Sequence, residues 1–345
     1  MDLPWTHALQ RCENAASLNG RDAMSFYCLH GEDNIRAMFE HMAALQKLFT
    51  EAGAPSFFGD NLIALYLNMT VMFNEAFPQA FSAAVTKGAA EDEIKLWRLH
   101  TLSWCGKAAL NVPGDFVECD VYKGLYSAML TQYLDWAKID RRFYLYDTFT
   151  GLPEEWSSQQ ERDGVNQFYE WEGPYERVCE RFAKYHNVDV IQGVVPDVFE
   201  QKAPDQIALL HLDLNAAKAE VAALDSIGGR LSNGAVVLMD DYGRREQKEL
   251  AEALTIWWWE RDHAILELPT GQGMVTVNAE KLQAFEGAGM TKQAIGFFGL
   301  GDRGSIFHCG DLGMGQVDLP VLDAHRAKDW HDLAPRMAEL CPAEL

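Results

Sequence analysis

The sequence predicts an α/β fold in which helices cover both faces of a mostly parallel β-sheet. Short apolar runs alternate with helical stretches between residues 113 and 280, which is the pattern of successive βαβ units. Several of these runs end in acidic residues, and open α/β sheets bind their ligands at the carboxyl ends of the strands. With 345 residues, 48% of them hydrophobic, the chain is long enough to bury a large core.

The expected strands are seven apolar runs, at residues 116–119, 143–147, 188–193, 207–213, 235–241, 264–268 and 274–277. A helix is expected up to residue 136, and others over residues 174–186, 216–227 and 245–259. The last two strands are joined by Pro-Thr-Gly-Gln-Gly, which suits a hairpin, so one strand is expected to run antiparallel.

The two ends of the chain have a different texture. Apolar residues recur at helical spacing over residues 35–49, 62–81 and 94–110, so the first hundred residues are expected to be helical. The pattern fades from about residue 282, although residues 323–340 are typical of one more amphipathic helix. We therefore expect a helical N-terminal region (1–95), an α/β domain (96–280) and a C-terminal extension (281–345).

The composition excludes several classes of partner. Asp and Glu total 51 against 29 Lys and Arg, so the net charge of −22 repels nucleic acids and anionic lipids. No run reaches the roughly 20 apolar residues of a membrane span, and the N-terminus lacks a signal-peptide pattern. The seven scattered cysteines suit free thiols in a reducing compartment. We expect a cytoplasmic protein that binds a small molecule.

The second expected strand ends in Asp147, a residue of the right type and place to bind both hydroxyls of a ribose. The alternative is a helix N-cap, because Thr148 and a turn follow. The turn after the first strand, ECDVYKG (118–124), resembles a nucleotide-binding turn but has a single glycine, so an ordinary strand-to-helix turn remains the alternative.

Asp213, Asp240 and Asp241 form the sharpest cluster, because neighbouring strands bring their side chains close together. Three like charges at such distances are unfavourable unless a cation neutralises them, and an all-oxygen ligand set favours Mg²⁺, Ca²⁺ or Mn²⁺. The alternative is that Asp240 caps the next helix while Asp213 contacts a cofactor.

Three residues are candidates for a general base. His186 precedes the third strand and therefore lies at the wrong end of the sheet. His211 precedes Asp213 by two residues, so it faces the same side roughly 6–7 Å further down the strand. Tyr242 is a poor base, because the ordinary pKa of tyrosine is about 10. A structural role for either histidine is the alternative.

Two aromatic segments are candidates for contacts outside the core. Trp257, Trp258 and Trp259 span too much of one helix to form a single stripe, so we expect core or subunit contacts and a homo-oligomer. Residues 154–173 form a polar loop rich in aromatic residues, which is either a lid or an exposed crossover loop.

Taken together, the motifs resemble the macrocin O-methyltransferase-like family of bacterial natural-product methyltransferases. The resemblance covers about residues 95–280, where the motifs occur in the family's order: GDFVECDVYKG (114–124), FYLYDTFTGLP (143–153), IQGVVPDVF (191–199), LLHLDLNAAKAEVAAL (209–224), NGAVVLMDDYG (233–243) and LPTGQG (268–273).

The resemblance implies a class I methyltransferase fold, which is Rossmann-like and doubly wound, with a seven-stranded sheet whose last strand is antiparallel. It also implies S-adenosylmethionine as methyl donor, a small-molecule hydroxyl as acceptor, and Mg²⁺ or Mn²⁺ as metal. The implied metal ligands are Asp213, Asp240 and Asp241. The implied cofactor residues are Glu118, Cys119, Asp120 and Gly124 near the methionine, Asp147 and Thr148 at the ribose, Gly193 and Val194 at the adenine, and Asp213.

The sequence departs from the family pattern at two positions. The family usually has glycine where Asp120 stands, so a side chain here either crowds the methionine moiety or pairs with its ammonium group. The best-known members have a carboxylate, thought to act as base, where Asn215 stands. We therefore expect the metal held by Asp213 to supply most of the activation and Asn215 to orient the hydroxyl, with His211 acting at most through a water.

The leading hypothesis is thus a metal-assisted O-methyltransferase that acts on a sugar or another natural-product intermediate. The alternative is a non-catalytic subunit that binds S-adenosylmethionine and retains the fold, which Asp120 and Asn215 motivate. A nicotinamide-dependent dehydrogenase is disfavoured, because the turn after the first strand lacks the GxGxxG pattern.

Overall fold

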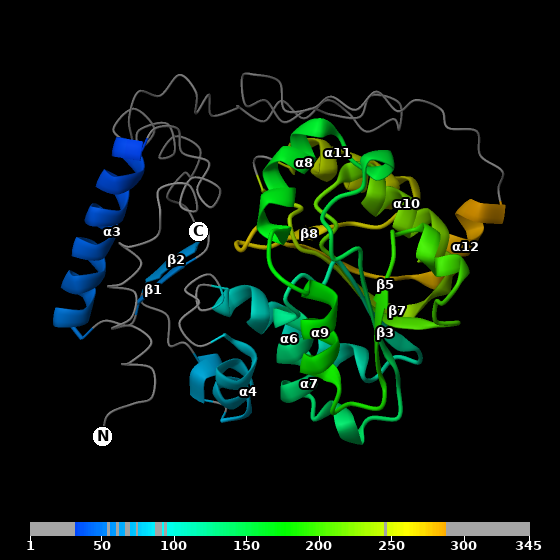
Figure 1. The fold of residues 1–345 in the computed structure, drawn as a ribbon, viewed down its shortest axis with the longest axis horizontal. Helices are drawn as coiled ribbons and strands as arrows, with labels where there is room; N and C mark the ends of the chain where they lie inside the picture. Colours follow the sequence, from blue (N-terminus) through cyan, green and yellow to red (C-terminus); the bar gives the residue numbers. More distant parts are fainter. Residues whose placement is uncertain are drawn as a thin grey trace, which may run out of the picture. The chain divides into compact units, whose positions relative to one another are not determined.

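The structure is a computed structural model that describes residues 32–53, 56–59, 62–65, 70–73, 75–86, 92, 95–244 and 247–287. Its centre is a seven-stranded sheet in the order β5-β4-β3-β6-β7-β9-β8 (Figure 1). The strands are β3 (Asp115–Cys119), β4 (Phe143–Asp147), β5 (Val188–Gln192), β6 (Ile207–Leu212), β7 (Leu231–Met239), β8 (Leu266–Glu267) and β9 (Gly273–Thr276).

The sheet confirms the expected strands and their directions. β3 pairs in parallel with β4 and β6, while β9 runs antiparallel to both β7 and β8. The order in which successive strands are added to the sheet reverses at β3. β4 and β5 lie on one side of β3, and the next strands in the chain, β6 and β7, lie on the other side. Such a reversal is where open α/β sheets bind ligands. The strand expected over residues 264–268 is shorter, since only Leu266–Glu267 pair with β9.

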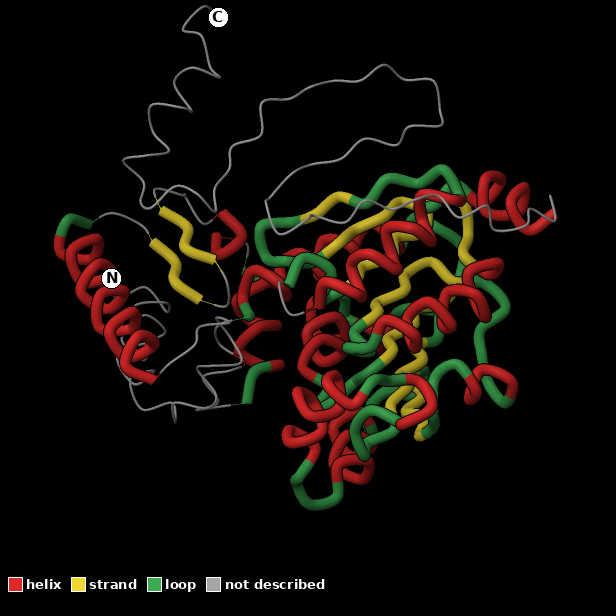
Figure 2. Tube along the Cα trace, turned by 90° about the horizontal axis from the view of Figure 1, so that it is seen from above, coloured by secondary structure: helices red, strands yellow, loops and turns green. Residues whose placement is uncertain are grey.

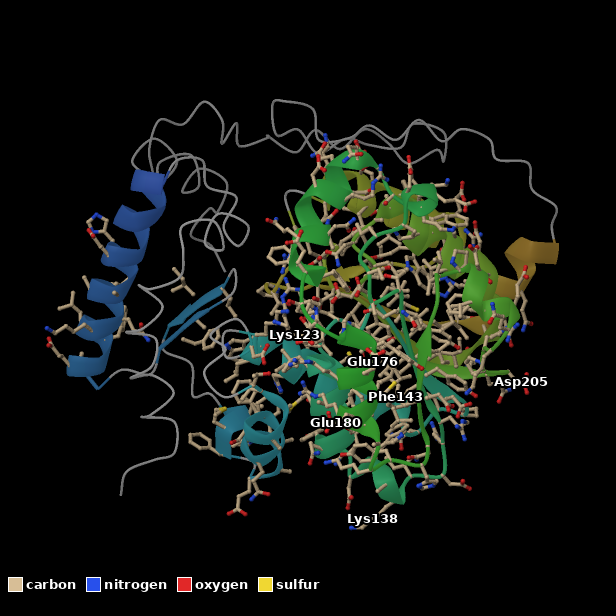
Figure 3. All side chains as sticks on the ribbon, viewed as in Figure 1. Lys123, Lys138, Phe143, Glu176, Glu180 and Asp205 are labelled. Atoms are coloured by element: carbon tan, nitrogen blue, oxygen red, sulfur yellow. The ribbon has the colours of Figure 1, made fainter. Side chains whose placement is uncertain are left out.

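Side chains alternate along the buried strands and form a core on each face of the sheet. Phe116 and Phe143 face one core, while Val117 and Tyr144 face the other. Figure 2 shows helices on both sides of the strands, and Figure 3 shows side chains filling the space around Phe143. This two-faced burial explains why the strands read as continuous apolar runs rather than as alternating ones.

The helices divide between the two cores. Those that pack on the first core are α4 (Ala76–Ala84), α6 (Leu96–Ala109), α7 (Leu125–Tyr133) and α9 (Pro174–Phe182). Those on the second are α10 (Ala217–Ile227) and α11 (Lys248–Glu260). Gly106 lets α6 approach α7 closely, because a Cβ at this position would lie 2.6 Å from Leu130 Cδ2. On α11, Trp258 is buried while Trp259 is 44% exposed.

The remaining elements are short, and most connect the strands to the helices. They are the 3₁₀ helices η3 (Trp136–Lys138), η4 (Glu154–Trp156), η5 (Asn166–Tyr169), η6 (Asp197–Glu200) and η7 (Gly228–Arg230), and the helices α8 (Gln159–Val165) and α12 (Ala279–Gly287). The chain divides into two units at residues 285 and 286, and residues 288–345 of the second unit lie outside the described residues. The helix expected over residues 323–340 lies outside the described residues.

The N-terminal region is less helical than expected. Helix α3 (Glu32–Glu51) confirms the helix predicted over residues 35–49. The prediction of a helix over residues 62–81 is wrong for the first half of that range. There β2 (Leu62–Leu65) pairs antiparallel with β1 (Ser56–Gly59), and η2 (Thr70–Phe73) follows. A four-residue apolar run fits a strand as well as a helix, so pairing with β1 decides its conformation. Among the described residues, no helix is both long and apolar enough to cross a bilayer.

Candidate cofactor and metal site

A cavity lies at the carboxyl ends of β3, β4, β5 and β6, where the strand order reverses. Its empty volume, including open solvent at the mouth, is about 370 Å³. The residues that line it include Asp120, Asp147, Thr148, Gly193, Val195 and Leu214. Four predicted cofactor residues therefore come together here: Asp120, Asp147, Thr148 and Gly193.

The other predicted cofactor residues lie outside the lining of this cavity. Glu118 and Cys119 are buried below it in β3, and Val195 rather than Val194 lines the adjacent wall. Gly124 begins α7 with φ of 73°, and a Cβ there would lie 2.8 Å from Phe182 Cε2. Only glycine fits this position without strain, because both the backbone angle and the packing require it.

Asp147 organises the turn after β3. Its Oδ2 accepts the backbone N–H groups of Val121 at 2.8 Å and Tyr122 at 2.6 Å, and its Oδ1 accepts that of Phe149 at 2.5 Å. It caps no helix among the described residues, because the N-cap of the following α8 is Ser158. Oδ1 therefore keeps an accepting position for a ligand on the cavity side.

Asp120 lies on the same wall in a conformation that favours glycine, with φ of 71°. Its Oδ1 accepts a hydrogen bond from the hydroxyl of Tyr169, at the end of η5. Burial, followed by the charges of Asp147 and Asp213, raises the pKa of Asp120 well above its usual value. The ionised form of this carboxyl group is therefore disfavoured unless a positive charge lies beside it.

The aromatic loop over residues 154–173 covers the cavity. Trp156 lines it, and the ring of Tyr169 meets that of Tyr122 with centroids 5.3 Å apart. The capping box at the start of α8 places Glu161, whose Oε1 accepts the N–H of Ala217 at 3.0 Å. These contacts favour the lid interpretation of this loop over the exposed-loop alternative.

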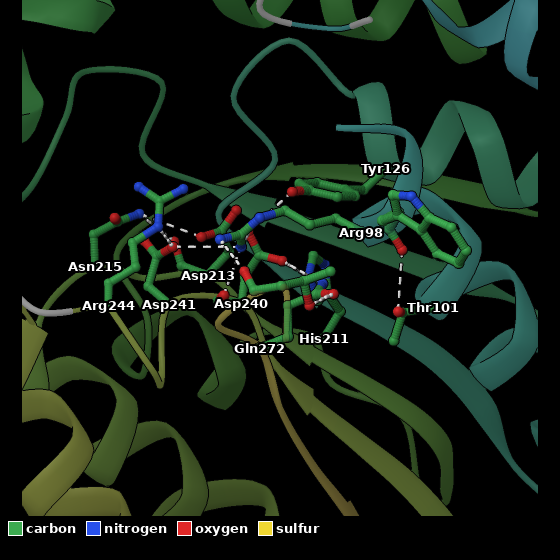
Figure 4. A network of polar contacts seen from close by, with 12 residues as sticks. Arg98, Thr101, Tyr126, His211, Asp213, Asn215, Asp240, Asp241, Arg244 and Gln272 are labelled. Atoms are coloured by element: carbon green, nitrogen blue, oxygen red, sulfur yellow. Dashed lines mark hydrogen bonds and ion pairs between the residues drawn. The ribbon is translucent and has the colours of Figure 1, made fainter. Parts of the chain in front are cut away.

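A second group of polar side chains lies around Asp240, at the end of β7 (Figure 4). Asp240 Oδ2 accepts hydrogen bonds from Arg98 at 2.8 Å and from the hydroxyl of Tyr126 at 2.9 Å. Its Oδ1 accepts one from Gln272 at 2.6 Å. Burial raises the pKa of Asp240, but Arg98 and His211 more than compensate and hold it well below its usual value.

The structure places the other predicted metal ligands unequally. Donor atoms of His211, Asp213 and Asp240 all lie within 4.8 Å of one another. Asp241 is not in this group, and its Oδ1 pairs with Arg244 Nε at 2.7 Å and lies 3.6 Å from Arg98 Nη1. Asp213 and Asp240 thus converge as expected, whereas Asp241 does not join them.

His211 is a buried bridge rather than an exposed base. Its Nδ1 lies 3.2 Å from Glu118 Oε1 and its Nε2 lies 3.6 Å from Asp240 Oδ1. Burial lowers the pKa of His211, but hydrogen bonds to Asp240 and Glu118 raise it to about 10. The side chain is 1% exposed. As an imidazolium it balances the two carboxylates and is not available as a metal ligand.

Asp213 and Asn215 lie together at the mouth of β6. Asn215 has φ of 54°, and its Nδ2 donates to the backbone oxygen of Asp213 at 2.7 Å. Burial, followed by Asp240 and Asp241, raises the pKa of Asp213 well above its usual value. Burial and the two neighbouring carboxylates therefore outweigh the positive charges of His211 and Lys95 at Asp213, and a divalent cation between Asp213 and Asp240 fits this donor set.

The other base candidates lie apart from this group. His186 is exposed, in the segment between α9 and β5. The hydroxyl of Tyr242 is 2.7 Å from Thr255 Oγ1, and burial raises its pKa further. Neither is positioned as a proton acceptor at the cavity.

Sequence reasoning missed several residues that hold Asp240 in place, namely Arg98, Tyr126 and Gln272. Arg98 is fully buried on α6 beside Leu99 and Leu102. The available signal was an arginine within an apolar helical face, which requires a buried partner. Nothing in the sequence indicates that this partner is Asp240, which lies 142 residues away.

The strand order, with its antiparallel β9, and the cavity at the reversal point define a class I methyltransferase fold. Residues 93–261 match the macrocin-O-methyltransferase (TylF) family, which is the family that the sequence motifs resemble. The expected family and fold are therefore confirmed.

One curated relative is the 8-demethyl-8-(2,3-dimethoxy-alpha-L-rhamnosyl)-tetracenomycin-C 4'-O-methyltransferase of Streptomyces olivaceus. It is 31% identical over 167 residues, which are 44% of this chain and 63% of the relative. The chain thus spans less than two thirds of the length of this relative.

Among solved structures, the O-methyltransferase NovP is 21% identical with a TM-score of 0.46, and the match covers 53% of this chain and 81% of NovP. The calicheamicin methyltransferase CalS11 is 18% identical with a TM-score of 0.44, over 59% of this chain and 91% of CalS11.

Proposed function

We propose that this protein is an S-adenosylmethionine-dependent O-methyltransferase that methylates a hydroxyl group of a small molecule. The observation that carries the proposal is the acidic cavity at the reversal point of the sheet, in a chain whose residues 93–261 match an O-methyltransferase family. S-adenosylmethionine is cationic at sulfur, and the carboxylates of Asp120, Asp147 and Asp213 give the site the complementary charge.

Particular residues are suited to hold each part of the cofactor. Asp147 would accept a ribose hydroxyl through Oδ1, which also accepts the backbone N–H of Phe149. Thr148, Gly193 and Val195 would line the adenosine portion, and Asp120 would face the charged end. When bound, the cofactor supplies an activated methyl group on sulfur. The protein must then align the acceptor oxygen and keep water out, which the loop carrying Trp156 and Tyr169 is placed to do.

We further propose that the enzyme uses Mg²⁺ or Mn²⁺, held by Asp213 and Asp240. A divalent ion there would lower the pKa of an acceptor hydroxyl and orient it. Arg98, Tyr126 and Gln272 fix the carboxylate of Asp240. Asn215 would orient the hydroxyl through its side-chain oxygen, because its Nδ2 is already bonded to Asp213.

The proposed acceptor is a sugar hydroxyl on a natural product or its intermediate. This proposal rests on the similarity to the Streptomyces olivaceus relative, a 4'-O-methyltransferase of a rhamnosyl tetracenomycin. We propose that the protein is cytoplasmic. We also propose that it forms a homo-oligomer, because Trp104 on α6 is 56% exposed and Trp259 on α11 is 44% exposed. Light scattering that shows a monomer at micromolar concentration would contradict the assembly.

The test of the function is turnover of labelled S-adenosylmethionine against pools of glycosylated and hydroxylated metabolites. We expect label in an O-methyl product that depends on added Mg²⁺ or Mn²⁺.

The second candidate is a non-catalytic subunit that binds the cofactor. Asn215 favours this candidate, because an amide is not a base and its Nδ2 is already bonded to Asp213. Tight cofactor binding without turnover of any acceptor would support that candidate.

A further inference from the structure

The carboxylates at the carboxyl edge of the sheet fall into two classes. Asp240 and Asp241 pair with the built-in cations Arg98 and Arg244. Asp120, Asp147 and Asp213 form no salt bridge with any residue that the structure describes. Each carboxylate of the first class has an arginine beside it, whereas those of the second class have none in the described part of the chain.

Asp120 is the member of the second class most exposed to the contents of the cavity. It lines the cavity beside Asp147, whereas both oxygens of Asp147 already accept backbone N–H groups. Among the described residues, Asp120 accepts a hydrogen bond from one donor, the hydroxyl of Tyr169. Its carboxyl group therefore has free accepting positions in a partly closed space, where its Coulomb interaction with a bound cation would be stronger than in water.

The backbone of Asp120 also points to a specific role for its side chain. Its φ of 71° is a conformation that side chains other than those of Asn and Asp rarely adopt. Glycine would satisfy this turn with less strain, and it would remove one of the two carboxyl groups that line the cavity. The backbone conformation of this turn therefore does not account for the carboxyl group of residue 120.

We propose that Asp120 makes the cavity selective for the sulfonium form of the cofactor over its thioether product. This inference rests on the proposed function. S-adenosylmethionine and S-adenosylhomocysteine share adenosine, ammonium and carboxylate groups, and they differ in the methyl group and the positive charge on sulfur. A carboxylate without a counter-charge stabilises the first and gains nothing from the neutral sulfur of the second. The charge therefore favours exchange of spent product for fresh donor.

The experiment is calorimetric titration of the full-length protein with S-adenosylmethionine, S-adenosylhomocysteine and sinefungin, which carries an amine in place of the sulfonium. Asp120→Asn keeps the shape and tolerates the backbone angle. We expect it to weaken the two cationic ligands by about tenfold or more and to change the affinity for S-adenosylhomocysteine by less than about threefold. Asp120→Gly should do the same if the variant with Asn is poorly folded.

The matched control is Asp205→Asn, an exposed carboxylate that points outward in Figure 3 and should change none of the three affinities. An equal loss for all three ligands would overturn the inference, because Asp120 would then contact the shared ammonium group. Unchanged affinities would overturn it as well. Wild-type protein that binds none of the ligands would contradict the proposed function together with this inference, whereas the first two results contradict the inference alone.

Discussion

Arg98 Nη1 lies 2.8 Å from Oδ2 of Asp240 and 2.6 Å from the backbone oxygen of the same residue, so that one guanidinium fixes both the side chain and the end of β7. Its Nη2 donates to the backbone oxygen of Thr270 at 2.9 Å. Both charged side chains are almost completely buried, with exposures of 0% and 4%. Arg98 thus ties α6 to the edge of the sheet where the proposed metal site lies.

Replacement of Arg98 should therefore be strongly destabilising. Arg98→Met keeps the length of the side chain but leaves the buried charge of Asp240 without its main partner, which is expected to remove about 3–5 kcal/mol from the free energy of unfolding. The control is Arg142→Met, since Arg142 pairs with Asp189 and its side chain is 45% exposed. That change should remove less than about 1 kcal/mol. Urea unfolding measures both, and equal losses would contradict the structural role of Arg98.

The stability of the protein should depend on pH through Glu220, which is fully buried on α10. Burial, followed by the charge of Asp241, raises its pKa from 4.5 to about 8. Between these two values the folded state binds more protons than the unfolded state, so the stability contributed by this group falls as the pH rises.

Glu220→Gln removes this titration while keeping the shape of the protonated side chain. The melting temperature of the variant relative to wild type should therefore increase from pH 5 to pH 8. Glu249→Gln, at an exposed position on the adjacent helix, should show a difference that does not vary with pH. A constant difference for Glu220→Gln would show that this carboxyl group ionises normally in the folded protein.

The sequence predicted the sheet well because each strand is buried on both faces and ends in a recognisable polar residue. It predicted Asp120, Asp147 and Gly193 at one cavity because the carboxyl ends of parallel strands meet at one edge. It did not predict that residues 62–65 form a strand, since local pattern alone does not identify the partner β1. The strand was missed because long-range pairing leaves no local signal in the sequence.

The same limit applies to the predicted metal ligands. Adjacent position in the chain made Asp240 and Asp241 look equivalent, and both carboxylates do lie near Arg98. Asp240 also contacts Tyr126 and His211, whereas Asp241 pairs with Arg244. Only the structure shows which of the two converges with Asp213.

Cofactor binding should depend on Asp147. Asp147→Ala removes the acceptor proposed for the ribose and also frees the backbone N–H groups of Val121 and Tyr122, so the turn loses its shape. Affinity for S-adenosylhomocysteine, measured by calorimetry, should fall by about tenfold or more. Asp140→Ala changes an exposed carboxylate before β4, at the opposite end of that strand, and should leave the affinity unchanged. Unaltered binding by Asp147→Ala would move the cofactor site elsewhere.

Metal binding should separate Asp213 from Asp241. Asp213 forms no salt bridge with any described residue and converges with Asp240, so Asp213→Asn should abolish Mn²⁺ binding detected by electron paramagnetic resonance. Asp241 pairs with Arg244, so Asp241→Asn should weaken Mn²⁺ binding by less than about tenfold. The opposite order would restore Asp241 as a ligand, and full turnover in excess chelator would remove the metal from the mechanism.

The identity of the base is tested most directly at His211. A base must be unprotonated before it accepts a proton, but the carboxylates of Asp240 and Glu118 raise the pKa of His211 to about 10 against the opposing effect of burial. Its ring is 1% exposed, and the edge of the Tyr126 ring covers it with centroids 4.9 Å apart. At neutral pH His211 is therefore a cation that holds Glu118 and Asp240 together.

His211→Gln should consequently cost less than about tenfold in turnover, or about 1.4 kcal/mol of activation free energy, because an amide still donates hydrogen bonds. Asp213→Asn should cost at least about a hundredfold, because it removes a proposed metal ligand. His211 also contributes stability that is fully present below pH 6.5 and is lost as the pH rises toward about 10, so the variant should melt lower than wild type at pH 6. A loss of a hundredfold or more in turnover for His211→Gln, with cofactor affinity and melting temperature preserved, would make His211 the base and assign Asn215 and the metal secondary roles.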